Sequence, residues 1–399
     1  MSVSDVRMVE DAHLAKFYAK KQLTIVRGKG ALVFDAEGKE YVDCMGSYGT
    51  CIVGHAHPKV AEAIADQARK LIACHGSTYN DARARFVSKL LTITPRGMNR
   101  FFLSNSGAES VECAIKLARK STGRRKIVAI KGGFHGKTYG ALSATWDSKY
   151  RKSFEPLVPD FAHVPFNNEE AAKNNISQET AAVLVEPIQG EGGIRVATAA
   201  WLSLLRDLTK DAGALLVADE IQSGFGRTGR MFACDHYGIT PDILCLGKGI
   251  ASGLPLAVTV ASDEIMGSLA VGEHTSTFGG NPVACAAGEA TINVLLEEHL
   301  VENSARVGEY FKDQLLEMQT QLRIVREVRG MGLMLGVELR FDVHSILQSA
   351  LQQGVILLDA GRNVVRFLPP LSIQKNHVDL VLSCLRKILA EEELAKLPS

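Results

Sequence analysis

Ala214-Leu215-Leu216-Val217-Ala218-Asp219-Glu220 is an apolar run that ends in two carboxylates. A run of this length and composition is typical of a buried strand, and parallel strands carry their chemistry at their carboxyl ends. Asp219 is therefore a candidate functional residue, and its strand is expected to lie inside a sheet.

Similar apolar runs alternate with helical patterns from about residue 58 to residue 280. We expect helices at 58–72, 81–94, 107–121 and 198–212, and short buried strands at 100–103, 127–130, 181–186, 214–219, 243–246 and 256–261. Such alternation predicts an α/β fold in which helices cover a mainly parallel sheet.

The two ends of the chain follow a different pattern. A helix and then a hairpin, with strands at 31–34 and 40–43, are expected near the N-terminus. Beyond residue 280 the pattern predicts helices at 282–297, 300–319, 343–353 and 375–393, and strands at 325–329, 333–339, 355–358 and 364–367. We therefore predict a large domain over 58–280 and a smaller α+β domain over 281–399, which the N-terminal segment, 1–57, joins.

Composition excludes several classes of function. The 399 residues carry 45 Lys and Arg against 44 Asp and Glu, so no overall field would attract nucleic acid or an anionic membrane. No apolar run reaches membrane-spanning length, and residues 1–10 lack the apolar core of a secretory signal. The eight cysteines form no Cys-x-x-Cys pair, so we expect reduced thiols in a cytoplasmic protein and no metal site.

Lys248 lies in the apolar, glycine-rich stretch Leu244-Cys245-Leu246-Gly247-Lys248-Gly249. An apolar setting disfavours the ammonium form, so this amine could act as a nucleophile that makes Schiff bases with carbonyls. The alternative is an ordinary solvated lysine near a turn. Asp219, about thirty residues earlier at a strand end, favours the catalytic interpretation.

Two further turns follow expected strands. Ser104-Asn105-Ser106-Gly107-Ala108-Glu109 leads into a helix, whose free N–H groups and dipole could bind a phosphate, although Ser106 could instead be a simple N-cap. Lys131-Gly132-Gly133-Phe134-His135-Gly136 could present an aromatic face to a planar ring. The alternative is that Phe134 belongs to the core and His135 to a hydrogen-bonded loop.

Together these stretches resemble the class III, ω-amino group of pyridoxal-phosphate aminotransferases. The resemblance covers nearly the whole chain, and its motifs occur in the group's order: Ser106-Gly107-Ala108-Glu109, Phe134-His135-Gly136, Glu186-Pro187-Ile188-Gln189-Gly190-Glu191-Gly192-Gly193, Asp219-Glu220-Ile221-Gln222-Ser223-Gly224-Phe225-Gly226-Arg227-Thr228-Gly229, Gly247-Lys248-Gly249 and Ser276-Thr277-Phe278-Gly279-Gly280-Asn281-Pro282. It implies the fold-type I architecture of these transferases and pyridoxal 5'-phosphate (PLP) as the cofactor.

Within this group the chain most resembles acetylornithine aminotransferases. Three segments are most similar to archaeal-type enzymes of lysine and arginine synthesis, which act on substrates tethered to a small amino-group carrier protein: Leu142-Ser143-Ala144-Thr145-Trp146, Val325-Arg326-Glu327-Val328-Arg329-Gly330-Met331-Gly332 and Val365-Arg366-Phe367-Leu368-Pro369-Pro370. The resemblance implies transfer of an ω-amino group from acetylornithine-like or carrier-linked lysine or ornithine substrates to 2-oxoglutarate, by a ping-pong mechanism.

The resemblance also implies roles for residues that would contact the cofactor. Lys248 would hold PLP as a Schiff base and shuttle a proton, while Asp219 would keep the pyridine nitrogen protonated. Ser106, Gly107 and Ala108 would bind the phosphate, together with Thr277 from the second subunit of a homodimer. Phe134 or His135 would stack on one face of the ring, and Ile221 would pack on the other. Gln222 would contact the ring hydroxyl. Glu186 would be a structural acid near the site.

Substrate recognition is expected to be divided between two ends of the pocket. Arg366 would clamp an α-carboxylate, and Glu191 would neutralise Arg366 when an ω-amine enters. Tyr48 could contact the substrate, although a core tyrosine is the alternative. Lys137 stands where many relatives have arginine, so the distal carboxylate of 2-oxoglutarate would be held less rigidly.

Other interpretations stay open at this point. A free ornithine or 4-aminobutyrate aminotransferase is the main alternative within the fold. The stretch Gly224–Gly229 fits the G-x-G-x-x-G pattern of an NAD(P)-dependent oxidoreductase, but no helical period follows it. His55-Ala56-His57 lacks a third metal ligand nearby. If the substrate is carried on a small acidic protein, Lys149, Arg151 and Lys152 are candidates for a basic rim.

Overall fold

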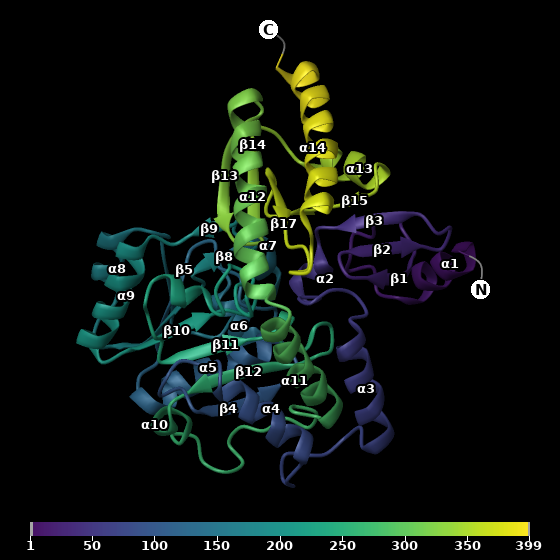
Figure 1. Cartoon of the computed structure of the whole chain (residues 1–399). Helices are drawn as coiled ribbons and strands as arrows, with labels where there is room; N and C mark the ends of the chain where they lie inside the picture. Colours follow the sequence, from purple (N-terminus) through teal and green to yellow (C-terminus); the bar gives the residue numbers. More distant parts are fainter. Residues whose placement is uncertain (1–2, 398–399) are drawn as a thin grey trace.

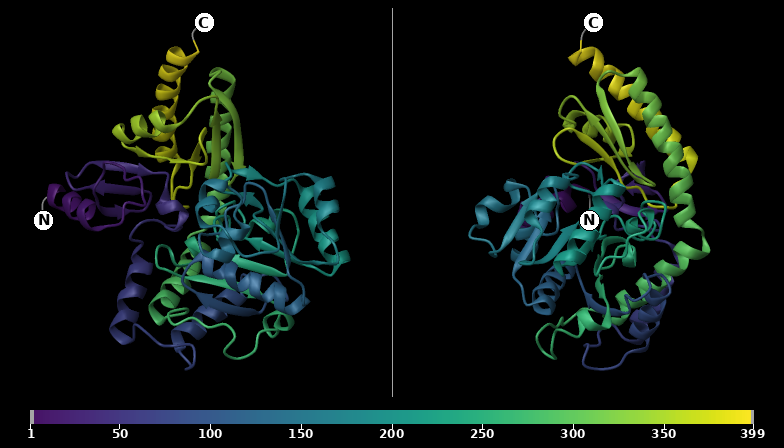
Figure 2. Two further views of the ribbon diagram at one scale, coloured as in Figure 1. Left: turned by 180° about the vertical axis from the view of Figure 1, so that it is seen from behind. Right: turned by 90° about the vertical axis from the view of Figure 1, so that its left-hand side faces the viewer.

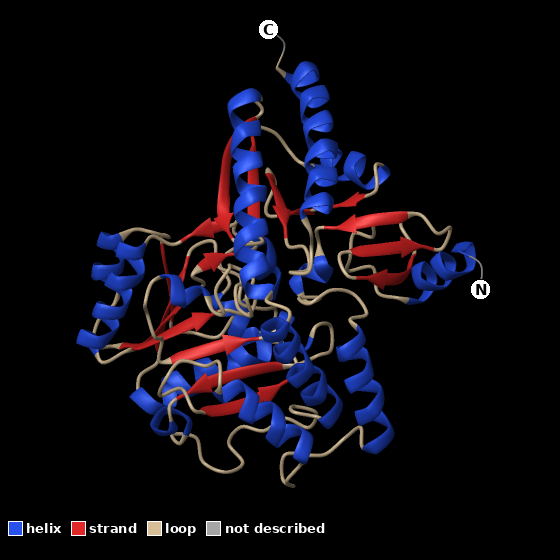
Figure 3. Ribbon diagram, viewed as in Figure 1, coloured by secondary structure: helices blue, strands red, loops and turns tan. Residues whose placement is uncertain are grey.

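A seven-stranded sheet forms the centre of the computed structural model, which describes residues 3–397 (Figures 1 and 3). Its order is β4-β12-β11-β10-β7-β5-β6. The strands are β4 (Arg100–Ser104), β5 (Lys126–Ile130), β6 (Phe161–Val164), β7 (Thr180–Val185), β10 (Leu215–Asp219), β11 (Ile243–Leu246) and β12 (Ala257–Ala261). Only β12 runs antiparallel to its neighbours. The expected α/β fold with a mainly parallel sheet is confirmed.

Helices cover both faces of this sheet, as the continuous apolar runs of its strands require. Along β10, Leu216 packs in a cluster with Trp201 of α9 (Ala199–Ala212). The next residue, Val217, points to the other face and packs with Leu117 of α5 (Gly107–Thr122). α8 (Glu169–Asn175) lies beside α9, and α6 (Tyr139–Ala144), α7 (Ser148–Arg151) and α10 (Asp263–Met266) complete the region.

The C-terminal part of the chain forms a second, antiparallel sheet in the order β13-β14-β17-β16. Its strands are β13 (Val325–Met331), β14 (Met334–Leu339), β16 (Leu358–Asp359) and β17 (Val364–Phe367). The long helices α12 (Leu300–Gln321) and α14 (Lys375–Lys396) pack beside it, together with α13 (His344–Gln352). Two views show α12 and α14 rising from the central region toward the C-terminus (Figure 2).

The N-terminal segment contributes a third sheet, ordered β1-β2-β3-β15. β2 (Leu32–Asp35) and β3 (Glu40–Asp43) form the expected hairpin, β1 (Ile25–Lys29) flanks it, and α1 (Val3–His13) precedes it. β15 (Val355–Ile356) pairs in parallel with β3. The expectation of one strand over 355–358 is therefore wrong, because Leu357 separates β15 from β16, which belongs to a different sheet. The domain boundaries themselves stay a prediction.

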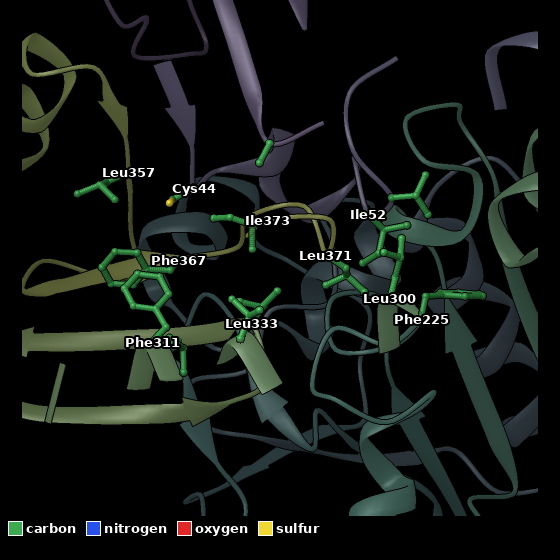
Figure 4. Packing of buried hydrophobic residues seen from close by; sticks show 14 of the residues in the cluster. Cys44, Ile52, Phe225, Leu300, Phe311, Leu333, Leu357, Phe367, Leu371 and Ile373 are labelled. Carbon is green, nitrogen blue, oxygen red and sulfur yellow. The ribbon is translucent and has the colours of Figure 1, made fainter. Parts of the chain in front are cut away.

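One hydrophobic cluster runs through all these parts. It includes Ile52 from the N-terminal segment, Phe225 from the central region, and Phe311, Phe367 and Leu371 from the C-terminal part (Figure 4). The rings of Phe311 and Phe367 meet edge to face, with centroids 4.9 Å apart.

Three helices pack together at the edge of the central region: α3 (Pro58–Lys70), α4 (Asp81–Leu91) and α11 (Pro282–Glu297).

Several short elements were not expected from the sequence. They are β1, β6, α6, α7, α8, α10, the left-handed turn α2 (Gly46–Gly49), and the paired strands β8 (Ile188–Gln189) and β9 (Arg195–Val196). Most are too short to show a hydrophobic period, and β6 is only partly buried. No helix within residues 3–397 has the length and apolar character needed to cross a membrane.

Candidate active site

The site lies at the carboxyl edge of the central sheet, where loops follow β4, β5, β7, β10 and β11. These loops carry most of the residues that the sequence singles out: Ser106, Gly107, Ala108, Phe134, His135, Lys137, Glu186, Glu191, Asp219, Ile221, Gln222 and Lys248. β17 brings Arg366 to the same place from the C-terminal sheet, and α2 brings Tyr48. Hydrogen bonds and close packing join this set into one network.

Asp219, the last residue of β10, pairs with His135 from the loop after β5. Asp219 Oδ2 lies 2.7 Å from His135 Nδ1, and Oδ1 accepts a hydrogen bond from the Ile221 N–H at 3.1 Å. Burial alone would lower the pKa of His135, but the hydrogen bond and charge of Asp219 outweigh it and raise that pKa. Since the His135 ring is fully buried against Asp219, Phe134 is the half-buried aromatic left to face a ligand.

Lys248 follows β11 directly and has φ +42°, a strained value for a residue with a side chain. Its amine makes no hydrogen bond or ion pair with any residue between 3 and 397. Burial lowers the pKa of Lys248, although the charges of Glu191, Asp219 and Glu186 act in the opposite direction. A desolvated amine without a partner is suited to nucleophilic attack on a carbonyl.

The turn between β4 and α5 presents free backbone donors. Ser106 is the N-cap of α5, and its Oγ accepts from the Glu109 N–H, so the N-cap alternative is correct as far as it goes. The N–H groups of Gly107 and Ala108 have no acceptor within the helix and lie at its positive end. A Cβ on Gly107 would lie only 2.8 Å from Ile221 Cδ1, so Ile221 packs directly over this turn.

Thr277 lies in a neighbouring loop and is not joined to Ser106, Gly107 or Ala108 by any hydrogen bond among the described residues. The adjacent Ser276 accepts a hydrogen bond from Asn105 Nδ2 at 3.2 Å. Asn105 and Thr277 line one cavity of about 340 Å³. Thr277 is predicted to belong to the site, but within residues 3–397 of one chain the structure does not connect it to the other site residues.

Arg366 and Glu191 form a largely shielded ion pair. Arg366 Nη1 donates to Glu191 Oε1 at 2.6 Å and to Gln222 Oε1 at 3.3 Å, and the Arg366 side chain is only 1% exposed. Burial would raise the pKa of Glu191, but the adjacent guanidinium outweighs it and lowers that pKa. Arg366 therefore does not take part in an ordinary surface ion pair. The Gln222 side chain points toward the same guanidinium.

Tyr48 stands at the mouth of the site. Its side chain is 51% exposed, which excludes the core alternative, and its ring centre lies 5.9 Å from Arg366 Cζ. Ser47 and Tyr48 both have left-handed backbone angles, a strained arrangement that often marks functional sites. Tyr48 also lines a groove of about 880 Å³ between the N-terminal segment and α13, together with Lys21, Lys39 and Asp359.

Sequence reasoning missed Tyr150 as a member of the site. Its ring meets Phe134 edge to face at 5.4 Å, and the ammonium groups of Lys137 and Lys149 lie 5.2 and 4.7 Å from its centre. Lys149 also pairs with Asp147 at 3.1 Å. Tyr150 lies in the four-residue helix α7, which is too short to give a period, so no signal in the sequence marks it.

The oxidoreductase and metal-site interpretations find no support in the geometry. Gly226 and Gly229 pack closely against Val301 and Ala305 of α12, and turns, not a helix, follow them. His55 binds Asp43, whereas His57 faces Glu298. Within residues 3–397, no group of three His, Cys, Asp or Glu side chains is arranged to hold a metal ion.

The remaining features fit one cofactor. An aromatic aldehyde with a ring nitrogen and a phosphate needs an amine, an acid and an anion cradle, and Lys248, Asp219 and the start of α5 offer these. Ile221 and Phe134 offer flat apolar contacts for a ring. The residues present therefore fit PLP.

Comparisons with known proteins agree with this chemistry. The family model described as aminotransferase class-III matches residues 15–389. An acetylornithine aminotransferase of Methanopyrus kandleri is 43% identical over 95% of this chain and 97% of its own. A [LysW]-aminoadipate semialdehyde transaminase of Deinococcus radiodurans is 42% identical over 93% of this chain and 87% of its own.

Among solved structures, an ornithine aminotransferase of Toxoplasma gondii, described with PLP at partial occupancy in its active site, matches with a TM-score of 0.94. It is 32% identical and covers 98% of this chain and 96% of its own. The match spans the whole architecture, including the N-terminal segment and the C-terminal sheet. The chain therefore belongs to the class-III aminotransferases and is a PLP-dependent enzyme.

Proposed function

We propose that this enzyme transfers the ω-amino group of an acetylornithine-like or carrier-linked lysine or ornithine donor to 2-oxoglutarate, in lysine or arginine biosynthesis. The observation that carries the proposal is the short Arg366–Glu191 pair beside Lys248. The names of the relatives from M. kandleri and D. radiodurans describe these two kinds of donor.

In this proposal Lys248 holds the cofactor and moves the proton. PLP, when bound, supplies an electron sink for the carbon that carries the reacting amine. Burial lowers the pKa of Lys248, which favours the neutral amine, and this amine would accept a proton from that carbon and return it at the cofactor. The position of Lys248 directly after β11 places it within electrostatic reach of Glu191, Asp219 and Glu186.

Asp219 would keep the ring nitrogen of bound PLP protonated. Its carboxylate is held by His135 and the Ile221 N–H, so its orientation is set before any ligand arrives. Ser106, Gly107 and Ala108 would hold the phosphate, and Phe134 and Ile221 would pack against the ring, while Gln222 lies near Arg366. These assignments rest on the geometry above together with the membership of the family.

Arg366 and Glu191 divide the two half-reactions between them. While they are paired, the guanidinium is neutralised, so an ω-amine can enter without a carboxylate partner. For 2-oxoglutarate, Glu191 turns away and Arg366 clamps the α-carboxylate. Glu191 is 27% exposed, which gives it more freedom to move than the buried Arg366.

The end of the substrate away from Arg366 is expected to meet a surface of lysine and tyrosine side chains. Lys137 and Lys149 flank Tyr150 and can attract the distal carboxylate of 2-oxoglutarate, although neither offers the fixed fork of an arginine. Lys149 and Lys152 are exposed and Arg151 is half-buried, so the first two are the better candidates for a rim that meets an acidic carrier. The groove beside Tyr48 has room for more than a free amino acid.

We also propose that the enzyme is a homodimer in which Thr277 completes the phosphate site of the other subunit. Thr277 has no hydrogen bond to residues 106–108 of its own chain, and large apolar side chains, Ile72, Tyr79 and Phe278, are exposed on the same region of the molecule. A cytoplasmic location stays a prediction.

The test is a panel of free and carrier-linked ω-amines, compared by kcat/KM with 2-oxoglutarate as acceptor at low and moderate ionic strength. A carrier-linked donor should be preferred, and its kcat/KM should fall steeply with salt, because a basic rim steers an acidic partner. If N-acetylornithine is preferred and its kcat/KM changes little with salt, the donor is a free acetylornithine-like amine. Equal rates for free ornithine would make a free-metabolite enzyme the better conclusion.

A further inference from the structure

Glu186 is a buried acid that the proposed mechanism does not use. It follows β7 at the carboxyl edge of the sheet, and its side chain is only 6% exposed. Glu186 Oε1 accepts the Phe134 N–H at 2.9 Å, and Oε2 accepts the Gly190 N–H at 3.1 Å. One carboxylate therefore links the loop that carries Phe134 to the loop that carries Glu191.

Glu186 also faces the outer edge of the His135 ring. His135 Nε2 is buried and has no hydrogen-bond partner among residues 3–397. A Cβ on Gly133 would lie 2.9 Å from His135 Nε2 and 3.6 Å from Glu186 Oε1, so the two atoms border the same small space. Any side chain at residue 133 would fill that space, which explains why glycine is needed there.

The His135 ring therefore lies between the carboxylates of Glu186 and Asp219, with a hydrogen bond to Asp219 alone among the described residues. Two carboxylates flank one imidazole, and both raise the pKa of His135 against the effect of burial. Burial raises the pKa of Glu186 to about 7, while the charge of His135 lowers it and that of Asp219 raises it further. The other titratable groups around this space are Lys248, the Arg366–Glu191 pair, and His163 on β6, whose pKa burial lowers to about 4.

Glu220 offers an internal comparison. It is 0% exposed, and it also holds two backbone N–H groups, those of Ala233 and Cys234. Burial raises its pKa to about 7 as well, but the charged group that acts on it is Asp235, not His135 or Asp219. Glu220 therefore matches Glu186 in burial and in holding two backbone N–H groups, although it also accepts from the Ser223 hydroxyl at 3.4 Å, and it differs in the charged groups that act on it.

We infer that Glu186 is a positioning residue that fixes Phe134 and Glu191 relative to each other and places a negative charge beside the His135–Asp219 pair. The effect of the Glu186 charge on the cofactor assumes the PLP chemistry of the family. The effect of Glu186 on Glu191 rests on the donor selection proposed above. Neither Glu186 nor His135 touches the reacting atoms in this account.

The charge part predicts a spectroscopic shift in Glu186→Gln. In the holoenzyme, the visible absorbance of the bound cofactor changes with pH as the Lys248 nitrogen gains or loses a proton. Asp219 still holds the proton of His135, so loss of the Glu186 charge leaves the site more positive. The midpoint should move to lower pH by about half a unit or more, a threefold change in proton affinity.

Glu220→Gln is the matched control. It removes an equally buried carboxylate, so both variants should melt at a lower temperature than the wild type. The pH midpoint of the cofactor absorbance in Glu220→Gln should, however, stay within about 0.2 unit of the wild-type value. Equal loss of thermal stability in the two variants with no spectral shift in Glu186→Gln would overturn the inference, because Glu186 would then be merely structural.

Glu186→Asp carries the test if the glutamine variant does not fold. The shorter acid keeps the charge but cannot reach both the Phe134 and Gly190 N–H groups. Its spectral midpoint should match that of wild type, whereas its preference for ω- over α-amines should fall about fivefold. A shifted midpoint, or an intact preference in a protein where Glu191→Ala does relax it, would contradict the inference.

Discussion

Replacement of Glu191 by alanine should relax the choice between ω- and α-amines. In the wild type, an α-carboxylate that approaches Arg366 must first displace Glu191, which lies 2.6 Å from Arg366 Nη1. The two side chains are 1% and 27% exposed, so this pair is not screened as a surface pair would be. A hydrogen bond between charged groups contributes about 1.5–3 kcal/mol, which corresponds to roughly 10- to 150-fold in rate.

The assay is the half-reaction itself, followed by the absorbance of the bound cofactor in single turnovers. L-Glutamate and an ω-amine donor are compared with the wild type and Glu191→Ala. The ratio of kcat/KM values, glutamate over ω-amine, should rise by the factor above, because Gln222 still holds Arg366 in place. Glu297→Ala, which removes the surface partner of Lys59, is the control and should leave the ratio unchanged. An unchanged ratio in Glu191→Ala would refute the masking of Arg366.

Three further substitutions probe the rest of the site. Asp219→Asn removes the charge that we assign to the ring nitrogen, so kcat should fall by about ten- to a hundredfold, and a near-normal rate at full cofactor occupancy would count against the assignment. Lys137→Arg should lower KM for 2-oxoglutarate by roughly three- to tenfold, since a fork replaces a point charge; an unchanged or higher KM would place the distal carboxylate elsewhere. Thr277→Ala should weaken PLP binding by about tenfold, and mixing it with Lys248→Ala should regenerate activity, because one site of each hybrid dimer is then intact. Absence of such complementation would contradict a shared site.

The loops at the carboxyl edge could be predicted from the sequence because their signals are local. An apolar run before Asp219 and a second before Lys248 mark two strand ends, and strand ends of one parallel sheet meet at one edge. The helix start at Ser106 is equally local, since its cap and the first free N–H groups lie within three residues.

Other features depend on contacts between distant parts of the chain. The direction of the His135 ring is set by Asp219, which lies 84 positions away, and sequence alone left open whether His135 or Phe134 faces the ligand. Tyr150 joins the site through the packing of a four-residue helix. The split of residues 355–358 into β15 and β16 arises because β15 pairs with β3, near the other end of the chain, whereas β16 pairs with the next strand, β17.

The most direct test of the site is borohydride reduction of the holoenzyme followed by peptide mapping. Reduction should fix one cofactor per chain on Lys248, the half-buried lysine without an ion-pair partner among residues 3–397, and Lys248→Ala should bind the cofactor without becoming covalently labelled. Reduced cofactor recovered on another lysine of the wild-type enzyme would contradict the account.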